Sequence, residues 1–231
     1  AIAAAPENFE AHTAFAGMLM ETINKFDTAE AHLRSALEAN PNYGPAHNNL
    51  ALLLNARGQL EDAATEARRA AQLAPSHAPA LITLGSILLE LGDADEAARV
   101  LRDAVKILPE DADAHANLGV ALKFIGSLPD AEAALKRALE LSPENTKSLN
   151  DLAVLYSDSG RLEEAEALLA RAVHLKPDDA ALNANIGNIY RRREKWGESI
   201  TSFRRAFDLD SKNLNRAQEF VDSLGGAHFL Q

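Results

Sequence analysis

The chain contains 231 residues, of which 47% are hydrophobic and 25% are charged, so it has enough apolar material for a core and does not have the composition of a disordered protein. Its 34 acidic and 23 basic residues give a net charge of −11, which argues against non-specific nucleic-acid binding because such binding requires many neutralised phosphates. The absence of cysteine excludes disulfides and thiolate chemistry.

The first nine residues resemble the end of a helix whose beginning is missing. The stretch AIAAAP at 1–6 has the same order of small and apolar residues before a proline as ALEANP at 36–41. We interpret 1–9 as the remnant of a preceding repeat. Because the chain opens with alanine rather than methionine, we interpret it as a fragment or a processed product.

Six units of 34 residues follow in a constant register. They occupy 10–43, 44–77, 78–111, 112–145, 146–179 and 180–213. In the unit at 112–145, apolar residues recur at intervals of three and four before Gly126, and again between Gly126 and Pro143. This pattern predicts two amphipathic helices joined by a turn. A small residue recurs every 34 positions, as Gly17, Ala51, Gly85, Gly119, Ala153 and Gly187.

A leucine or isoleucine precedes this small residue in five of the six units, and a proline lies near the end of five of them. This pattern resembles the tetratricopeptide repeat family, whose unit is a 34-residue helix–turn–helix. The resemblance implies an all-α fold, a right-handed superhelical solenoid of six repeats in which each hairpin buries its apolar face against its neighbours. Residues 214–231 are predicted to form a capping helix with one polar face, followed by a short tail. The expected fold is therefore six stacked hairpins and a terminal helix, without a sheet.

Glycines mark the predicted hairpin turns of repeats two to five. A glycine can adopt the left-handed conformation that ends a helix, at little steric cost. In the first and last repeats Asn24 and Glu194 take its place, so looser or different turns are expected in these two units. The turn glycines are Gly58, Gly92, Gly126 and Gly160.

The sequence gives little support for catalysis, so the protein is predicted not to be an enzyme, and no cofactor or metal is assigned. The motifs of serine hydrolases, P-loop proteins, zinc proteases and dinucleotide-binding folds do not occur. The seven histidines do not cluster, and His47 and His115, which share a repeat position, are predicted to pack between helices. The carboxylates Glu110, Asp111 and Asp113 are predicted to begin a helix, where negative charge is favourable, rather than to bind a metal.

The face of each first helix that does not pack carries the candidate binding residues. In tetratricopeptide arrays this face lines the concave side of the superhelix. Here position six, counted from the start of each unit, is an amide or a related polar residue in five of the six repeats. An amide can bond both the C=O and the N–H of an extended peptide, so the sequence predicts a groove that binds a partner peptide. The predicted contact residues are Asn49, Leu52, Asn55, Thr83, Asn117, Val120, Lys123, Phe124, Asp151, Val154, Asn185, Asn188, Arg191 and Arg192.

Two alternatives accompany this prediction. The row of asparagines, interrupted at Phe15 and Thr83, is similar to the repeat region of O-linked N-acetylglucosamine transferases, which implies a substrate-recognition or regulatory arm of a larger enzyme such as a glycosyltransferase. Alternatively, the position is only exposed and polar, because asparagine is common in the family motif N-L-G. The carboxylate clamp of chaperone-tail binders is excluded, since it requires a basic residue at position five, where none occurs here.

The expected partner is a protein or peptide. Nucleic-acid binding and membrane insertion are not expected, since no apolar run reaches the roughly 18 residues of a membrane span. Repeat six has a net charge of +3, so an acidic guest is expected near Arg191 and Arg192. No signal peptide is visible, and a cytoplasmic location is favoured.

The N-terminal edge is a second predicted interface. Its first helix has a cluster of apolar residues that nothing upstream in this chain covers, and such a patch usually marks an interaction site. Either earlier repeats of a longer protein or a second copy of the chain, through self-association, would cover it. The residues of this cluster are Phe9, Phe15, Met18, Leu19 and Met20.

Overall fold

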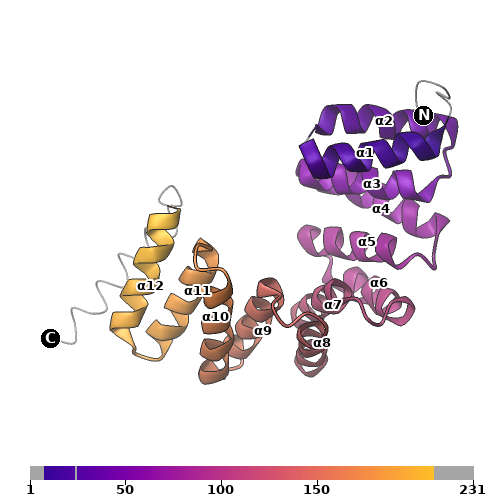
Figure 1. The fold of residues 1–231 in the computed structure, drawn as a ribbon. Coiled ribbons are helices and arrows are strands. Elements are labelled where there is room, and N and C mark those ends of the chain that lie inside the picture. Colours follow the sequence, from indigo (N-terminus) through magenta and orange to yellow (C-terminus); the bar gives the residue numbers. More distant parts are fainter. Residues whose placement is uncertain (1–7, 24, 211–231) are drawn as a thin grey trace. The chain divides into compact units, whose positions relative to one another are not determined.

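The structure consists of α-helices. A computed structural model describes residues 8–23 and 25–210, and these residues form twelve helices and no strand (Figure 1). The helices are α1 Phe9–Ile23, α2 Phe26–Ala39, α3 Gly44–Ala56, α4 Leu60–Leu73, α5 Ala78–Leu91, α6 Ala94–Ile107, α7 Ala112–Phe124, α8 Leu128–Leu141, α9 Thr146–Asp158, α10 Leu162–Leu175, α11 Ala180–Arg192 and α12 Trp196–Leu209.

The chain divides into two compact units, Ala1–Ser127 and Leu128–Gln231. In the first unit α1 packs on α2, α3 on α4 and α5 on α6, and the first helices α1, α3, α5 and α7 also contact their neighbours in that order, so they form one layer. In the second unit each helix from α8 to α12 packs on the next. The predicted all-α repeat fold is confirmed. Most of the N-terminal remnant and the whole capping helix lie outside the described residues.

Side chains at the repeat boundaries satisfy the first backbone amides of several helices. Asp111 accepts a hydrogen bond from the Ala114 amide at 2.7 Å, and Asn145 accepts one from the Ser148 amide at 3.0 Å. A helix start leaves such amides without partners inside the helix, so these caps define where the helix begins. The predicted role of Asp111 at a helix start is therefore confirmed.

The hairpin turns share one backbone conformation. The four turn glycines have φ between 74° and 84°, and Glu194 has φ of 58°. In repeat two the Gln59 amide donates to the Leu54 carbonyl at 3.0 Å, and in repeat six the Lys195 amide donates to the Tyr190 carbonyl at 2.9 Å. The expectation of a different turn at Glu194 is therefore wrong. The same carbonyls must be capped in every repeat, and this outweighs a left-handed cost of about 1–2 kcal/mol. Asn24 lies outside the described residues.

The recurring small residue marks where the two helices of a hairpin approach most closely. A Cβ atom built on Gly85 would lie 2.5 Å from Cγ of Leu101, which is fully buried. A Cβ on Gly187 would lie 3.2 Å from the ring of Phe203, which is 1% exposed. At the same position in repeat one, a Cβ on Gly17 would meet only the Asn49 amide at 3.7 Å. Glycine is therefore required in repeats three and six, where the opposing side chain comes this close, and not in repeat one.

We expect Gly85→Ala to lower the free energy of unfolding by about 1–3 kcal/mol, because the added methyl forces Leu101 out of a close-packed position. Gly17→Ala is the matched control and should leave the stability unchanged or raise it by up to about 1 kcal/mol, since alanine favours helix more than glycine does. Urea unfolding followed by circular dichroism measures both. Equal stability of Gly85→Ala and the wild type would contradict the close approach of α5 and α6.

Candidate interaction surface

Exposed apolar side chains gather on one side of the first helices in the N-terminal unit. Six large apolar side chains are exposed among residues 8–23 and 25–127, and four of them belong to α1, α3 or α7. Their repeat positions are 6, 9 and 13, which the helical spacing of three and four places on one side of a helix; we call this side the first-helix face. The Phe15 ring also packs edge-on against His32 of α2, with the ring centres 5.0 Å apart. We call the four residues the apolar strip: Phe15 is 39% exposed, Met18 60%, Leu52 40% and Phe124 66%.

The predicted polar residues of this unit are largely engaged between repeats. Asn55 Nδ2 donates to Glu90 Oε1 at 3.1 Å and so links α3 to α5. Thr83 is 8% exposed and Asn117 is 6% exposed, so both are buried, while Asn49 is half-buried. The row of polar residues predicted from the sequence is therefore uneven in its accessibility.

The remaining predicted residues of the unit surround Phe124. Val120 and Lys123 are half-buried on the same helix, α7. The Lys123 ammonium lies 5.3 Å from the centre of the Phe124 ring, within the range of a cation–π contact. The exposed ring is thus already positioned beside a positive charge.

In the C-terminal unit, the predicted residues lie on α9 and α11 and join these helices. Asn185 Nδ2 donates to Asn150 Oδ1 at 2.6 Å, and Arg192 donates to the Ser157 carbonyl at 2.9 Å. These bonds occupy one amide donor and one guanidinium N–H that the sequence analysis assigned to a guest. The others on these helices are Arg191, which donates to Asn188 Oδ1 at 2.8 Å, and the half-buried Asp151 and Val154.

The apolar cluster predicted at the N-terminal edge is only partly exposed. Leu19 is 5% exposed, and Phe9 and Met20 are half-buried, with the Phe9 ring 4.8 Å from that of Tyr43. Only Phe15 and Met18 are exposed, and they belong to the apolar strip. Self-association through this edge stays a prediction.

Charged pairs connect consecutive repeats. Position 21 is glutamate in repeats one, four and five, and in each case a cation from the turn of the next repeat binds it. The sequence pattern that marks these pairs is an acid at position 21 followed by a base at position 14 or 16 of the next unit. The pairs are Glu30–Arg57 at 2.5 Å, Glu132–Arg161 at 2.7 Å and Glu166–Lys195 at 2.8 Å.

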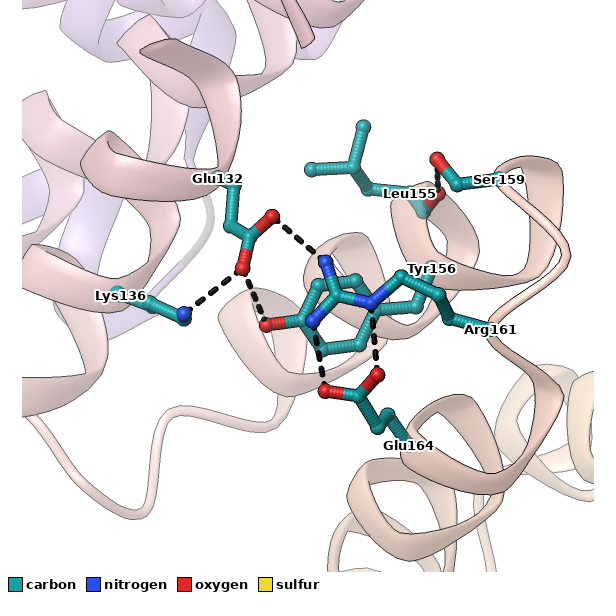
Figure 2. A network of polar contacts seen from close by, with 7 residues as sticks. All are labelled: Glu132, Lys136, Leu155, Tyr156, Ser159, Arg161 and Glu164. Carbon is teal, nitrogen blue, oxygen red and sulfur yellow. Dashed lines mark hydrogen bonds and ion pairs between the residues drawn. The ribbon is translucent and has the colours of Figure 1, made fainter. Parts of the chain in front are cut away.

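The pair at Glu132 is part of a larger network (Figure 2). The Glu132 carboxylate accepts bonds from Lys136 at 2.7 Å, Arg161 at 2.7 Å and the Tyr156 hydroxyl at 2.9 Å. The Arg161 guanidinium lies 3.8 Å from the centre of the Tyr156 ring and also binds Glu164 at 2.6 Å. Hydrogen bonds from Lys136 and Arg161 lower the pKa of Glu132 to about 2. The network holds α8, α9 and α10 together.

Polar side chains at position four attach the first helices to the preceding loop. His47 Nε2 donates to the Pro41 carbonyl at 3.0 Å, and His115 Nε2 donates to the Pro109 carbonyl at 2.9 Å. Asn183 Nδ2 makes the same bond to Pro177 in repeat six, also at 3.0 Å. These histidines are half-buried and bind loop carbonyls as well as packing. Within 8–23 and 25–210, no group of three or more histidines and acids is placed to hold a metal ion.

Two families match the sequence. The tetratricopeptide repeat family matches residues 16–78. The family described as the C-terminal domain of cilia and flagella-associated protein 70 matches residues 69–221, which is more than half of the chain. The chain belongs to the tetratricopeptide repeat family. None of the curated proteins compared with it matches significantly.

Solved structures similar to this tetratricopeptide repeat protein have its fold. A chain of the APC/C hetero-tetramer Cut9-Hcn1 matches with a TM-score of 0.85 and 19% identity, over 96% of this chain and 44% of that one. PilW, a type IV pilus biogenesis factor, matches at 0.81 and 20%, over 94% and 98%. YrrB, described as having an unusual peptide-binding site, matches at 0.58 and 24%, over 80% and 96%. The protein thus spans less than half of the Cut9-Hcn1 chain, and these identities show a common fold alone.

For this tetratricopeptide repeat protein, Glu132→Gln should lower the free energy of unfolding at pH 7 by about 1–3 kcal/mol, because charge-assisted hydrogen bonds are lost. The folded pKa of Glu132 is about 2, below the ordinary 4.5. Its contribution is therefore present above pH 4.5 and is lost as the pH falls towards 2. Urea unfolding across this pH range should show the two proteins converging in stability.

Glu140→Gln is the control for this experiment. Glu140 binds Arg137 at 3.0 Å and its side chain is 64% exposed, so its removal should cost less than about 1 kcal/mol. If Glu132→Gln lost the same stability at every pH, the carboxylate charge would not be the source of the effect.

Proposed function

We propose that this protein is an interaction scaffold that binds an extended segment of a partner protein on the first-helix face of its N-terminal unit. The observation that carries the proposal is the apolar strip, in which Phe15, Met18, Leu52 and Phe124 are exposed on first helices. Grouped apolar side chains at the surface of a protein usually mark an interface. These anchors lie on three of the four first helices of this unit, which form one layer.

Several anchors are needed for useful affinity. Full burial of one large apolar side chain contributes about 1.5–3 kcal/mol, whereas association costs at least about 4 kcal/mol in lost freedom of motion. One anchor therefore does not produce stable binding. Phe15 and Met18 lie on α1, Leu52 on α3 and Phe124 on α7, so the proposed partner segment extends along the layer of first helices.

Amide groups on α3 supply polar contacts for such a segment. Within the described part of the chain, Asn48 Oδ1 and Asn55 Oδ1 are buried and have no hydrogen-bond partner. An unsatisfied buried acceptor costs about 1–3 kcal/mol. Rotation of the Asn48 amide would present its oxygen to a backbone N–H of the guest. Binding would then remove a cost that the free protein bears.

The family and the related folds support a scaffold of this class rather than an enzyme. One similar structure is part of a multi-subunit assembly and another is described as having a peptide-binding site. The alternative of a glycosyltransferase arm relies on the row of asparagines at repeat position six, which is interrupted at Phe15 and Thr83. Since Asn117 is 6% exposed, we favour the apolar strip over that row as the main source of affinity.

The test begins with peptides selected on the full chain from a random library displayed on phage. We expect the double variant Met18→Ser, Leu52→Ser to bind the selected peptides about tenfold more weakly or worse, because two anchors are lost. Its unfolding temperature should fall by only a few degrees, roughly 2–4 °C for each kcal/mol lost, because Met18 is 60% and Leu52 40% exposed. Fluorescence anisotropy of the labelled peptides and a thermal melt measure the two quantities.

Ile107→Ser is the matched control for this double variant. Ile107 is 41% exposed, close to the 40% of Leu52, but it lies at the end of a second helix, α6. Its replacement should leave peptide affinity unchanged. Peptides that bind the double variant and the wild type equally well would show that the strip is not the binding surface.

A further inference from the structure

At two junctions between repeats, an arginine at position 14 reaches back to two acids of the preceding repeat. The acids occupy positions 18 and 21 in both cases, so the arrangement recurs with the same register. It places a guanidinium between the turn of one hairpin and the second helix of the hairpin before it. The two sets are Arg57 with Asp27 and Glu30, and Arg193 with Glu163 and Glu166.

The junction between repeats three and four lacks this arginine. Its position 14 is Ile125 and its position 21 is Ala98, but the acid at position 18 remains as Asp95. Asp95 is exposed, and it forms no ion pair with any described residue. The acceptor for a guanidinium is thus retained where the chain supplies no guanidinium of its own.

A cavity of about 300 Å³ lies at this junction. Its lining includes the apolar side chains Leu89 and Ile125, the ring of Phe124, and the carboxylates Asp93 and Asp95. The lining therefore combines apolar side chains with two carboxylates. Such a site favours a side chain with an apolar stem and a cationic end.

The cavity at the first junction has the opposite charge. It is lined by Lys25, Asp27 and Arg57, and its Lys25 occupies repeat position 16, where the later cavity has Asp93. The first cavity therefore contains two cations with one carboxylate. The later one has two carboxylates and is lined by no cation.

Phe124 adds a surface on which a guanidinium can stack. The side chain is 66% exposed, and the Lys123 ammonium lies 5.3 Å from its ring centre, so the ring already tolerates a neighbouring cation. The planar guanidinium of arginine stacks on aromatic rings and binds carboxylates through a fork of donors, whereas lysine offers a single charged point.

We infer that this cavity binds an arginine side chain of the partner segment, in the place that two other junctions fill with an arginine of the chain itself. The inference rests on the proposed function, and Phe124 connects the two sites because it belongs to both the apolar strip and the cavity wall. The unit 1–127 has 17 acidic and nine basic residues, so its field also attracts a basic guest.

The test uses two small probes on the full chain, N-acetyl-arginine methylamide and the neutral isostere N-acetyl-citrulline methylamide. Nuclear magnetic resonance follows the Ile125 methyl and Ala94 amide signals during titration. We expect saturable shifts with the arginine probe, and binding about fivefold weaker or worse with the citrulline probe. Asp95→Asn should weaken binding of the arginine probe by a similar factor. Ile125→Arg should abolish its binding, because the new side chain fills the cavity.

Glu61→Gln is the control, since Glu61 occupies position 18 of repeat two and is exposed, but Glu90 stands there in place of Phe124. The Glu61→Gln protein should bind the arginine probe with the affinity of the wild type. The inference would be overturned by equal affinity for both probes or by the absence of a shift with either. It would also be overturned if Asp95→Asn and Glu61→Gln bound the arginine probe with the same affinity. Loss of peptide affinity in the Met18→Ser, Leu52→Ser variant would in that case still support the proposed function. An unaffected double variant would count against the proposed function itself.

Discussion

Two hairpins depend on close contact between a glycine on the first helix and a large residue on the second. Gly85 against Leu101 and Gly187 against Phe203 are the tightest examples, because a single added methyl would overlap the opposing side chain. Where the second helix has alanine, as at Ala67, the first helix also has alanine, Ala51, and both are fully buried. In these repeats the two positions are close-packed, which fixes the spacing of the two helices there.

The junctions between hairpins are less uniform than the hairpins themselves. Charged groups join repeats one and two, four and five, and five and six, whereas apolar residues occupy the same positions between repeats three and four. A charged junction loses strength when its carboxylate is protonated or its cation is removed, while an apolar one does not. Stability in acid is therefore expected to differ along the array.

First and second helices use their charged and apolar side chains differently. Several charged side chains of second helices and turns bind a neighbouring repeat, so these groups are already occupied. First helices in the unit 1–127 leave apolar side chains exposed and bury several of their amides. Such a surface is suited to binding apolar side chains of a guest, because several of its own polar groups are already bonded within the protein. Nearby acidic residues favour a guest that is also positively charged.

The repeat period, the helical periodicity and the turn glycines determined the fold from sequence alone. They could do so because the residues within each repeat are sufficient to form its two helices and the turn between them. Accessibility could not be predicted in this way. Asn117 and Asn49 share a repeat position, but one is buried and the other half-buried, since neighbouring repeats differ in what they place beside them. The turn at Glu194 and the cavity beside Ile125 likewise depend on contacts outside the local sequence. Only the tertiary structure brings an acid of one repeat against a turn of the next, and it alone decided which side chains remain available to a partner.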